Sequence, residues 1–187
     1  MSIGIDMSDY SGMVGNVSVT VRDAITDEVL VEFTKYNRVT NNLMRSVSKY
    51  LTGSQSAVIP QYLAIGSGNS SVSSEDTQLD NEYRNPGTGQ FDRISLSKRA
   101  VQYDPSQGYS VAYGVTIPYA SHNGNGTYEI RELGLYADAV GTSSLMSRVI
   151  MPASVVVTKK PTVIIDIDWV LKLIPVSSES SVEGVDN

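Results

Sequence analysis

The segment from Tyr109 to Tyr119 alternates apolar and small polar residues over its whole length. One set of alternate positions holds Tyr109, Val111, Tyr113, Val115, Ile117 and Tyr119, and the other holds Ser110, Ala112, Gly114 and Thr116. Successive side chains of a β-strand point to opposite faces, so this period of two predicts a long strand with one buried face. Because such a face must pack against another element, the segment indicates a fold built mainly from antiparallel strands.

Two further regions of the chain show the same period of two. Residues 162–174 carry apolar side chains at one set of alternate positions, and the other set includes Asp166 and Asp168. Residues 16–22 and 29–33 alternate as well, and the residues between them are of types that favour turns. The first region predicts a closing strand, and the second predicts a β-hairpin.

Shorter apolar runs predict the remaining strands. These strands are 62–65, 91–103, 128–136 and 145–151. The second of them should pair with residues 109–119 in a long antiparallel hairpin. Strict alternation fails in the third, so we expect a β-bulge near Glu132 or Gly134.

One helix is expected between the hairpin and the next strand. Thr40 or Asn41 is a suitable N-cap, and Gly53 is a suitable end. The apolar residues between them fall at helical spacing and are Leu43, Val47, Tyr50 and Leu51. The spacing predicts about three helical turns.

These elements predict a mainly β fold, an antiparallel β-sandwich that is jelly-roll-like, with one short α-helix against an end. We expect residues 16–174 to form this domain. Residues 1–15 are predicted to be an extended N-terminal arm, and the Ser- and Glu-rich residues 175–187 an extended acidic C-terminal tail. Open sheet edges favour pairing with other chains, so we expect a homo-oligomer, and specifically a trimer.

Composition argues against several classes of protein. The chain has a net charge of −6, whereas sequence-independent binding to nucleic acid needs a basic surface. It has no cysteine, which excludes disulfides and thiolate metal sites. It has no run of about 18 apolar residues that could cross a membrane, and residues 1–9 lack the features of a signal peptide. We therefore expect synthesis in a cytoplasm, without nucleic-acid or membrane partners.

Gly66-Ser67-Gly68 follows a predicted strand, as a dinucleotide-binding fingerprint does. The third glycine of that fingerprint is missing, because residue 71 is Ser, and no phosphate-binding Gly-Lys-Ser/Thr lies nearby. We interpret Gly66 and Gly68 as a tight structural turn that uses the access of glycine to positive φ.

Asp166 and Asp168 lie two residues apart and share a strand face, so they are the available candidates for a metal site or for a hydrolase. The simpler interpretation is a charged outward face opposite an apolar inward one, and we favour it. His122 is the single histidine and lies in a Gly/Asn-rich loop. Nothing in the sequence marks a nucleophile and a carboxylate to complete a triad with it.

Two groups of residues are candidates for an interface. Tyrosine buries its ring while offering a hydroxyl, which suits wet contacts, and the chain has 11 of them. Tyr109, Tyr113 and Tyr119 could form a glycan-stacking platform, but core or interface packing is the better interpretation, since valines share their face. Arg131 and Glu132, with Glu129, could form ion pairs on a strand surface or across subunits.

Several short motifs occur in a particular order along the chain. They are Asn37-Arg38-Val39-Thr40-Asn41, Ile65-Gly66-Ser67-Gly68, Asp76-Thr77-Gln78-Leu79, Glu82-Tyr83-Arg84 and Glu132-Leu133-Gly134-Leu135-Tyr136. An Ile/Trp-rich closing strand over residues 165–170 follows. In this order the chain resembles a group of tailed-bacteriophage virion proteins, which includes capsid decoration proteins and tail- or fibre-associated proteins. The resemblance covers residues 36–174, and its Glu82 motif is one residue shorter than usual.

The resemblance implies a structural role in a virion and no enzymatic activity, so we expect no catalytic residue, no cofactor and no metal. The first hypothesis is a capsid decoration or cement protein that binds the major capsid protein or other virion proteins and stabilises the shell. Residues 1–15 and 175–187 would add contacts by reaching onto neighbours. The alternative is a tail, baseplate or fibre component involved in host attachment, in which a glycan contact is possible.

Overall fold

The computed structural model describes residues 13–84, 92–105, 108–119 and 128–173. Their elements, in chain order, are β1 (Met13–Asp23), β2 (Val29–Val39), α1 (Asn41–Leu51), β3 (Tyr62–Gly66), β4 (Ile94–Ser95), β5 (Lys98–Asp104), β6 (Gly108–Ile117), β7 (Tyr128–Ile130), β8 (Glu132–Tyr136), β9 (Leu145–Ile150), β10 (Val157–Lys159) and β11 (Val163–Leu173). The predicted hairpin, helix and closing strand are all present, and β1 begins at Met13, before the predicted start at residue 16.

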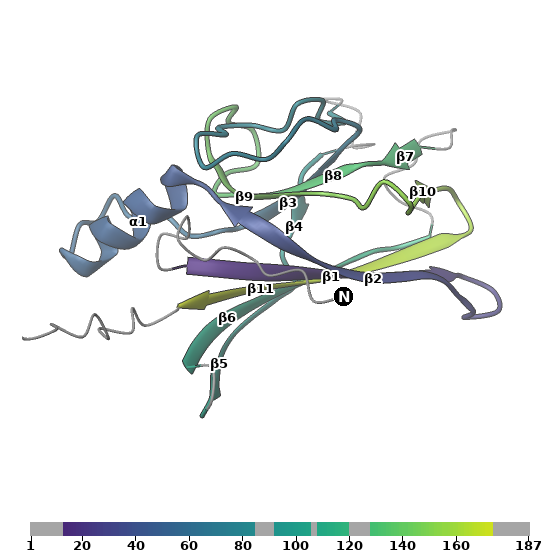
Figure 1. The fold of residues 1–187 in the computed structure, drawn as a ribbon, viewed down its shortest axis with the longest axis horizontal. Coiled ribbons are helices and arrows are strands. Elements are labelled where there is room, and N and C mark those ends of the chain that lie inside the picture. The colour runs from purple at the N-terminus through teal and green to yellow at the C-terminus, as the bar shows by residue number, and fades with distance from the viewer. Residues whose placement is uncertain (1–12, 85–91, 106–107, 120–127, 174–187) are drawn as a thin grey trace, which may run out of the picture.

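Nine strands form one antiparallel sheet in the order β4-β3-β8-β9-β2-β1-β11-β6-β5. The sheet curls into a half-barrel around the core, and β7 and β10 form a separate two-stranded sheet (Figure 1). Strand β2 links the two halves of the large sheet, since it pairs with β1 along its length and with β9 through Arg38 and Val39. The prediction of a mainly β fold with one short helix is confirmed. A jelly-roll-like sandwich would have two separate packed sheets, whereas these nine strands belong to one continuous sheet.

The strand predicted over residues 91–103 is interrupted. Strand β4 pairs with β3 at one edge of the sheet, whereas β5 pairs with β6 at the opposite edge. Leu96 and Ser97 connect them, and their backbone N–H groups donate to the carbonyls of Gln61 and Gly114, each at 2.9 Å. This short segment bonds to both halves of the sheet, which the curl of the sheet brings together at this point.

The inner face of the sheet carries the main core. Strands β1 and β11 alternate buried and partly exposed residues, as their sequences predict, whereas in β6 Ala112 and Gly114 are buried as well as Tyr113, Val115 and Ile117. The buried set includes Val19, Ile117, Ile167 and Trp169. The register opposes Val19 to Ile167 and Ile167 to Val115, so like residues meet across neighbouring strands.

Helix α1 follows β2 and packs on β9. Thr40 occupies its N-cap position without a side-chain cap, because its hydroxyl donates instead to the carbonyl of Leu145 at 2.6 Å. Gly53 follows the helix with φ of 72°, and the next N–H bonds back to the carbonyl of Lys49. Leu43 is buried, but Tyr50 and Leu51 are exposed. Within the described ranges no helix is long and apolar enough to cross a membrane.

Strand β8 explains the failure of alternation that predicted a bulge. All five of its residues are buried, so both faces of the strand are covered and no period of two remains. Arg131 separates β7, in the two-stranded sheet, from β8, in the large one, and the register against β9 shifts between Leu135 and Tyr136. The irregularities therefore lie on either side of the predicted Glu132 and Gly134.

Candidate functional site

The outer face of β8 is covered by the loop that follows β3, residues 67–83. The backbone N–H of Leu79 donates to the Tyr136 hydroxyl at 2.8 Å, and that of Tyr83 donates to the carbonyl of Ile65 at 2.9 Å. Leu79 and Tyr136 belong to a second small core with Ala64 and Leu145. The loop is thus packed onto the sheet along its length.

We call residues 67–83 the anchored loop. A buried arginine binds the middle of this loop. Arg148 on β9 has no exposed side-chain surface, and neither has Glu132 on β8. Its guanidinium donates to the Glu132 carboxylate at 2.8 and 3.1 Å and to Asp76 at 2.9 Å, and it lies 2.6 Å from an oxygen of Asp80. One cation therefore joins a carboxylate of the sheet to two carboxylates of the loop.

Backbone donors complete the coordination of Glu132. Its two oxygens accept N–H groups from Gly68 at 2.9 Å, Asn81 at 2.8 Å and Asp80 at 3.2 Å. Both oxygens are therefore occupied by donors of the chain itself. The cluster is saturated, so we interpret it as the element that fixes the loop rather than as a reaction centre.

The electrostatics of this cluster favour the charged forms of Arg148 and Asp80. Burial opposes the charge on Arg148, but hydrogen bonds to Asp76, Asp80 and Glu132 raise the pKa of the guanidinium. Burial also favours the neutral form of Asp80, yet hydrogen bonds from Ser70 and Arg148 hold the pKa of its carboxyl below the usual value. Charge pairing outweighs desolvation at both residues.

A second arginine holds the end of the anchored loop. Arg93 donates two hydrogen bonds to the Glu82 carboxylate, at 2.8 and 2.9 Å, and one to the backbone carbonyl of Asp138 at 3.0 Å. Its guanidinium lies 3.4 Å above the centre of the Tyr136 ring. Planar bidentate pairing and stacking are properties of arginine that lysine does not share.

Three glycines permit the close approach of loop and sheet. A Cβ atom on Gly66 would lie 2.6 Å from the Asn81 carbonyl oxygen, and one on Gly134 would lie 2.6 Å from Leu145 and 2.9 Å from Leu79. A Cβ atom on Gly68 would likewise collide with the Glu132 carboxylate. The expectation of positive φ at Gly66 and Gly68 is wrong, since neither adopts it. Lack of space, rather than an unusual backbone conformation, requires glycine here.

The structure brings together most of the motifs noted in the sequence. The end of β3 contributes Gly66, the anchored loop contributes Asp76 and Glu82, and β8 contributes Glu132 and Tyr136. These residues meet where the anchored loop contacts the sheet. The two arginines that hold them, one on β9 and one before β4, were not identified from the sequence. An arginine in a mostly apolar strand, Leu145–Ile150, was the one signal that could have indicated the first.

The candidate interface residues divide into buried and exposed ones. Glu132 and Tyr113 are buried within the chain, so neither is available to a partner, and burial raises the pKa of Tyr113. Arg131 is exposed and pairs with Glu129. Tyr109 and Tyr119 are exposed.

Of the weaker catalytic candidates, the structure describes Asp166 and Asp168. Asp166 accepts two hydrogen bonds from Arg22, at 2.7 and 3.0 Å, and one from Thr116, while Asp168 is exposed. No cluster of three or more metal-ligating side chains occurs in the part of the chain that the structure describes. His122 lies outside the described residues.

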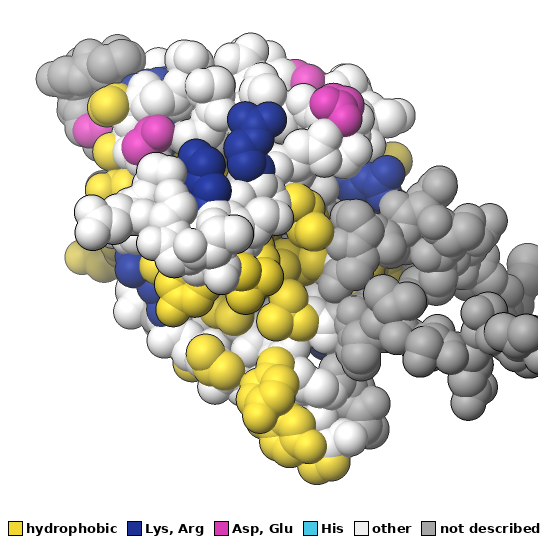
Figure 2. All heavy atoms as spheres, turned by 90° about the vertical axis from the view of Figure 1, so that its left-hand side faces the viewer, with side chains coloured by type: hydrophobic (Ala, Val, Ile, Leu, Met, Phe, Trp, Pro, Cys, Tyr) yellow, Lys and Arg dark blue, Asp and Glu magenta, His cyan; other side chains and the backbone are white. Residues whose placement is uncertain are grey.

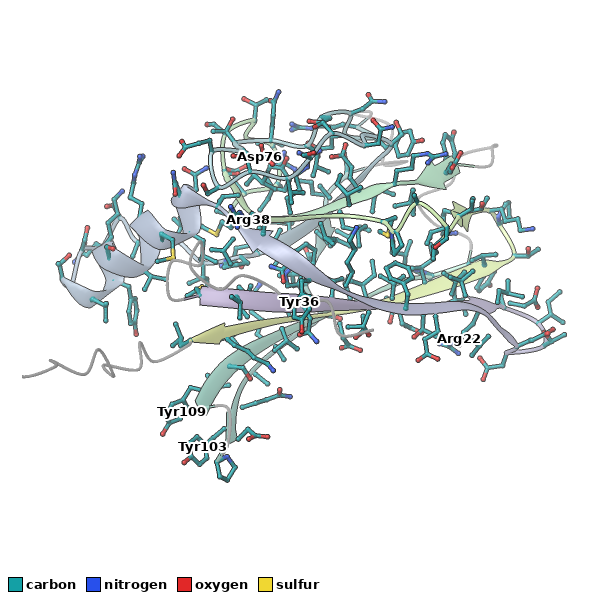
Figure 3. All side chains as sticks on the ribbon, viewed as in Figure 1. Arg22, Tyr36, Arg38, Asp76, Tyr103 and Tyr109 are labelled. Atoms are coloured by element: carbon teal, nitrogen blue, oxygen red, sulfur yellow. The ribbon has the colours of Figure 1, made fainter. Side chains whose placement is uncertain are left out.

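The inner face of the sheet extends beyond the core at the β5–β6 end. Val101, Tyr103, Tyr109 and Leu173 lie there on three neighbouring strands, with between 46% and 73% of their surfaces exposed. We call this group the apolar end. The rings of Tyr103 and Tyr109 pack against each other with centroids 4.9 Å apart (Figure 3). Hydrophobic side chains gather on this side of the molecule (Figure 2).

The apolar end adjoins an open sheet edge and both ends of the described domain. Strand β5 is the last strand of the sheet and pairs with β6 alone among the described strands. Met13, the first residue of β1, is opposite Leu173, the last residue of β11. Residues 1–12 and 174–187 therefore both continue from the end of the sheet that carries the apolar group.

Comparison with known proteins gives no relative from which a function could be transferred. The chain matches no family model, no curated protein and no solved structure at a significant level. Any functional conclusion must therefore come from the sequence and the geometry described above.

Proposed function

We propose that this protein is a non-enzymatic structural component of a tailed-bacteriophage virion, and specifically a capsid decoration or cement protein. It would bind the assembled shell through contacts between subunits and stabilise it. The observation that carries the proposal is the apolar end beside the open β5 edge, from which both terminal segments continue.

The apolar end has the properties of an assembly surface. Its residues occupy the same face as the buried Tyr113 and Trp169, so a partner placed there would extend the core packing. Exposed tyrosines and aliphatic side chains are enriched where proteins meet, and an open strand edge offers backbone donors and acceptors to a neighbour.

The anchored loop supports the same proposal in a different way. Its buried ion pairs and close-packed glycines hold it rigidly on the sheet, which suits a protein whose task is to present a fixed shape to its neighbours. We propose that copies of the chain meet as a homotrimer at the apolar end. The predicted arms, residues 1–15 and 175–187, lie outside the described residues except for residues 13–15 at the start of β1, and they would then reach the major capsid protein.

Electron microscopy of virions with gold-labelled antibody against the protein tests this proposal. Label spread over the head is the expected result. Label confined to the tail, baseplate or fibres would replace the decoration role with the alternative role in host attachment. Virions without label, beside a purified protein that the antibody detects, would overturn both.

A further inference from the structure

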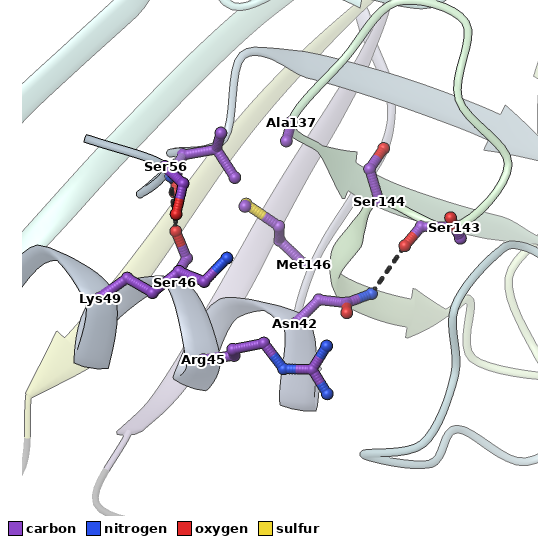
Figure 4. Close-up of a pocket in the computed structure, with 10 residues that line it drawn as sticks. Asn42, Arg45, Ser46, Lys49, Ser56, Ala137, Ser143, Ser144 and Met146 are labelled. Atoms are coloured by element: carbon purple, nitrogen blue, oxygen red, sulfur yellow. Dashed lines mark hydrogen bonds between the residues drawn. The ribbon is translucent and has the colours of Figure 1, made fainter. Parts of the chain in front are cut away.

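A small pocket lies between α1 and the segment that leads into β9 (Figure 4). Its volume is about 180 Å³, below the range of about 300–1,000 Å³ that suits drug-sized molecules, so it matches a single compact group. We call it the α1 pocket. The anchored loop and the apolar end do not contribute residues to it.

The walls of the α1 pocket are held in place by hydrogen bonds. The Asn42 amide donates to the carbonyls of Ser143 and Leu145 at 2.9 and 3.2 Å. The Ser46 hydroxyl donates to the carbonyl of Val58 and accepts the N–H of the same residue. The helix is therefore fastened to both neighbouring segments, and the pocket is formed before any ligand arrives.

Three donors at the pocket have no acceptor of their own. Arg45 and Lys49, one helical turn apart on α1, have no side-chain partner among the described residues, and the Ser144 hydroxyl is buried without one. Figure 4 shows Lys49 extending past Ser46 toward Met146, and Arg45 extending toward Asn42. Like charges at this spacing repel each other, so an anion between them would remove an unfavourable interaction.

The charge of the pocket is opposite to that of the whole chain. The net charge of the protein is −6, yet no acidic residue is among the described residues that line the pocket. A guanidinium, an ammonium and a hydroxyl are the donors that recognise phosphate and carboxylate groups. We propose that the α1 pocket binds a compact oxyanion, either a phosphate group or the carboxylate of an acidic sugar.

Titration of the full-length protein by ¹⁵N NMR tests this inference with sodium phosphate and with sodium glucuronate as probes. Ionic strength is held constant with NaCl, and glucose serves as an uncharged comparison. The expected result is saturable shifts of the Ser144 and Met146 amides with one of the two anions, at a Kd on the order of 1 mM. Saturation by phosphate alone identifies a phosphate site, and saturation by glucuronate alone identifies a sugar-acid site.

Two matched variants separate the pocket from general charge effects. Arg45→Gln/Lys49→Gln should weaken the binding at least about tenfold, the factor that 1.4 kcal/mol represents. Arg131→Gln/Lys160→Gln removes the same charge outside the pocket and should bind as the unaltered protein does. Equal weakening in both variants, or no saturable shift with either anion, would overturn the proposal. The location of the protein on a virion does not affect either result.

Discussion

Replacing Arg148 with methionine should destabilise the protein severely. The guanidinium contacts three carboxylates, and its side chain and that of Glu132 are both fully buried. Methionine fills a similar volume but leaves the Glu132 charge with backbone N–H groups alone. Removing one partner of a buried ion pair costs about 3–5 kcal/mol, a large part of the 5–15 kcal/mol by which a typical domain is stable.

Urea unfolding measured by fluorescence gives the magnitude directly. The single tryptophan, Trp169, is buried on the inner face and reports loss of the core. With a slope of about 2 kcal/mol per molar urea, the expected loss of 3–5 kcal/mol lowers the midpoint by roughly 1.5–2.5 M. A loss below about 1 kcal/mol would refute the claim that this cluster holds the loop.

Two further variants control this experiment. Arg22→Met breaks ion pairs with Asp27 and Asp166 at a surface site, and it should lower the urea midpoint far less than Arg148→Met does. Adding Glu132→Gln to Arg148→Met removes the unpaired charge, so the double variant should be more stable than the sum of the two single effects predicts, by about 0.5–3 kcal/mol. Strict additivity would show that the two side chains are not coupled.

Three other predictions concern titration and packing. Burial lowers the pKa of Lys159 to about 8 in the folded protein. Between this value and the usual pKa of 10.5, the unfolded chain binds more protons than the folded protein does. The free energy of unfolding should therefore rise from pH 8 toward pH 9.5, by at most about 1.4 kcal/mol per pH unit. In urea unfolding measured at several pH values, Lys159→Met should abolish this rise in stability and Lys160→Met should keep it. A stability of the unaltered protein that does not change with pH over this range would contradict the lowered pKa of Lys159. The pKa of Asp80 lies below its usual 3.8, so its contribution is present above that value and is lost as the pH falls beneath it; Asp80→Asn should make acid unfolding shallower, and an unchanged acid profile would count against the ion pair. Gly134→Ala places a methyl group within 3 Å of Leu145 and Leu79 and should cost about 1–3 kcal/mol, with an unchanged melting temperature as the contrary result.

The parts of the fold that the sequence predicted are those buried on one face. Strands β1 and β11 are buried at alternate residues, so their period of two is visible in the sequence. Strand β6 contacts the core through Val111, Tyr113, Val115 and Ile117, although Ala112 and Gly114 are buried too. Strand β8 is covered on both faces, and its pattern instead suggested a bulge. The anchored loop buries the second face of β8, and no pattern in the residues of β8 itself predicts that contact.

The candidate site was predicted in outline but not in its chemistry. The sequence indicated a structural turn at Gly66 and Gly68 and a motif at Asp76, and the structure places these residues together. It did not indicate that Glu132 is buried, because its partner Arg148 is 16 positions away and joins it only by strand pairing. A charged residue in a strand is normally taken to face solvent, and only the tertiary partner reverses that interpretation.

The division of β4 from β5 also lies beyond local inference. Residues 94–104 are compatible with one strand, but the curl of the sheet places their two halves at opposite edges. The hydrogen bonds of Leu96 and Ser97 that interrupt the strand depend on Gln61 and Gly114, which belong to different parts of the fold.

The central claim is that copies of the protein assemble through the apolar end, which would join their terminal segments into one multivalent ligand for the capsid, so binding to virions tests the claim. Virions stripped of the protein would be titrated with unaltered protein, with Tyr103→Ser/Tyr109→Ser, and with Ile25→Ser/Val140→Ser, which removes apolar side chains elsewhere that are even more exposed. We predict that the tyrosine variant stays folded and binds at least about tenfold more weakly, since tyrosine is enriched among the few interface residues whose loss costs about 2 kcal/mol or more. The Ile25/Val140 variant should bind as the unaltered protein does. Full binding by the tyrosine variant would contradict the claim.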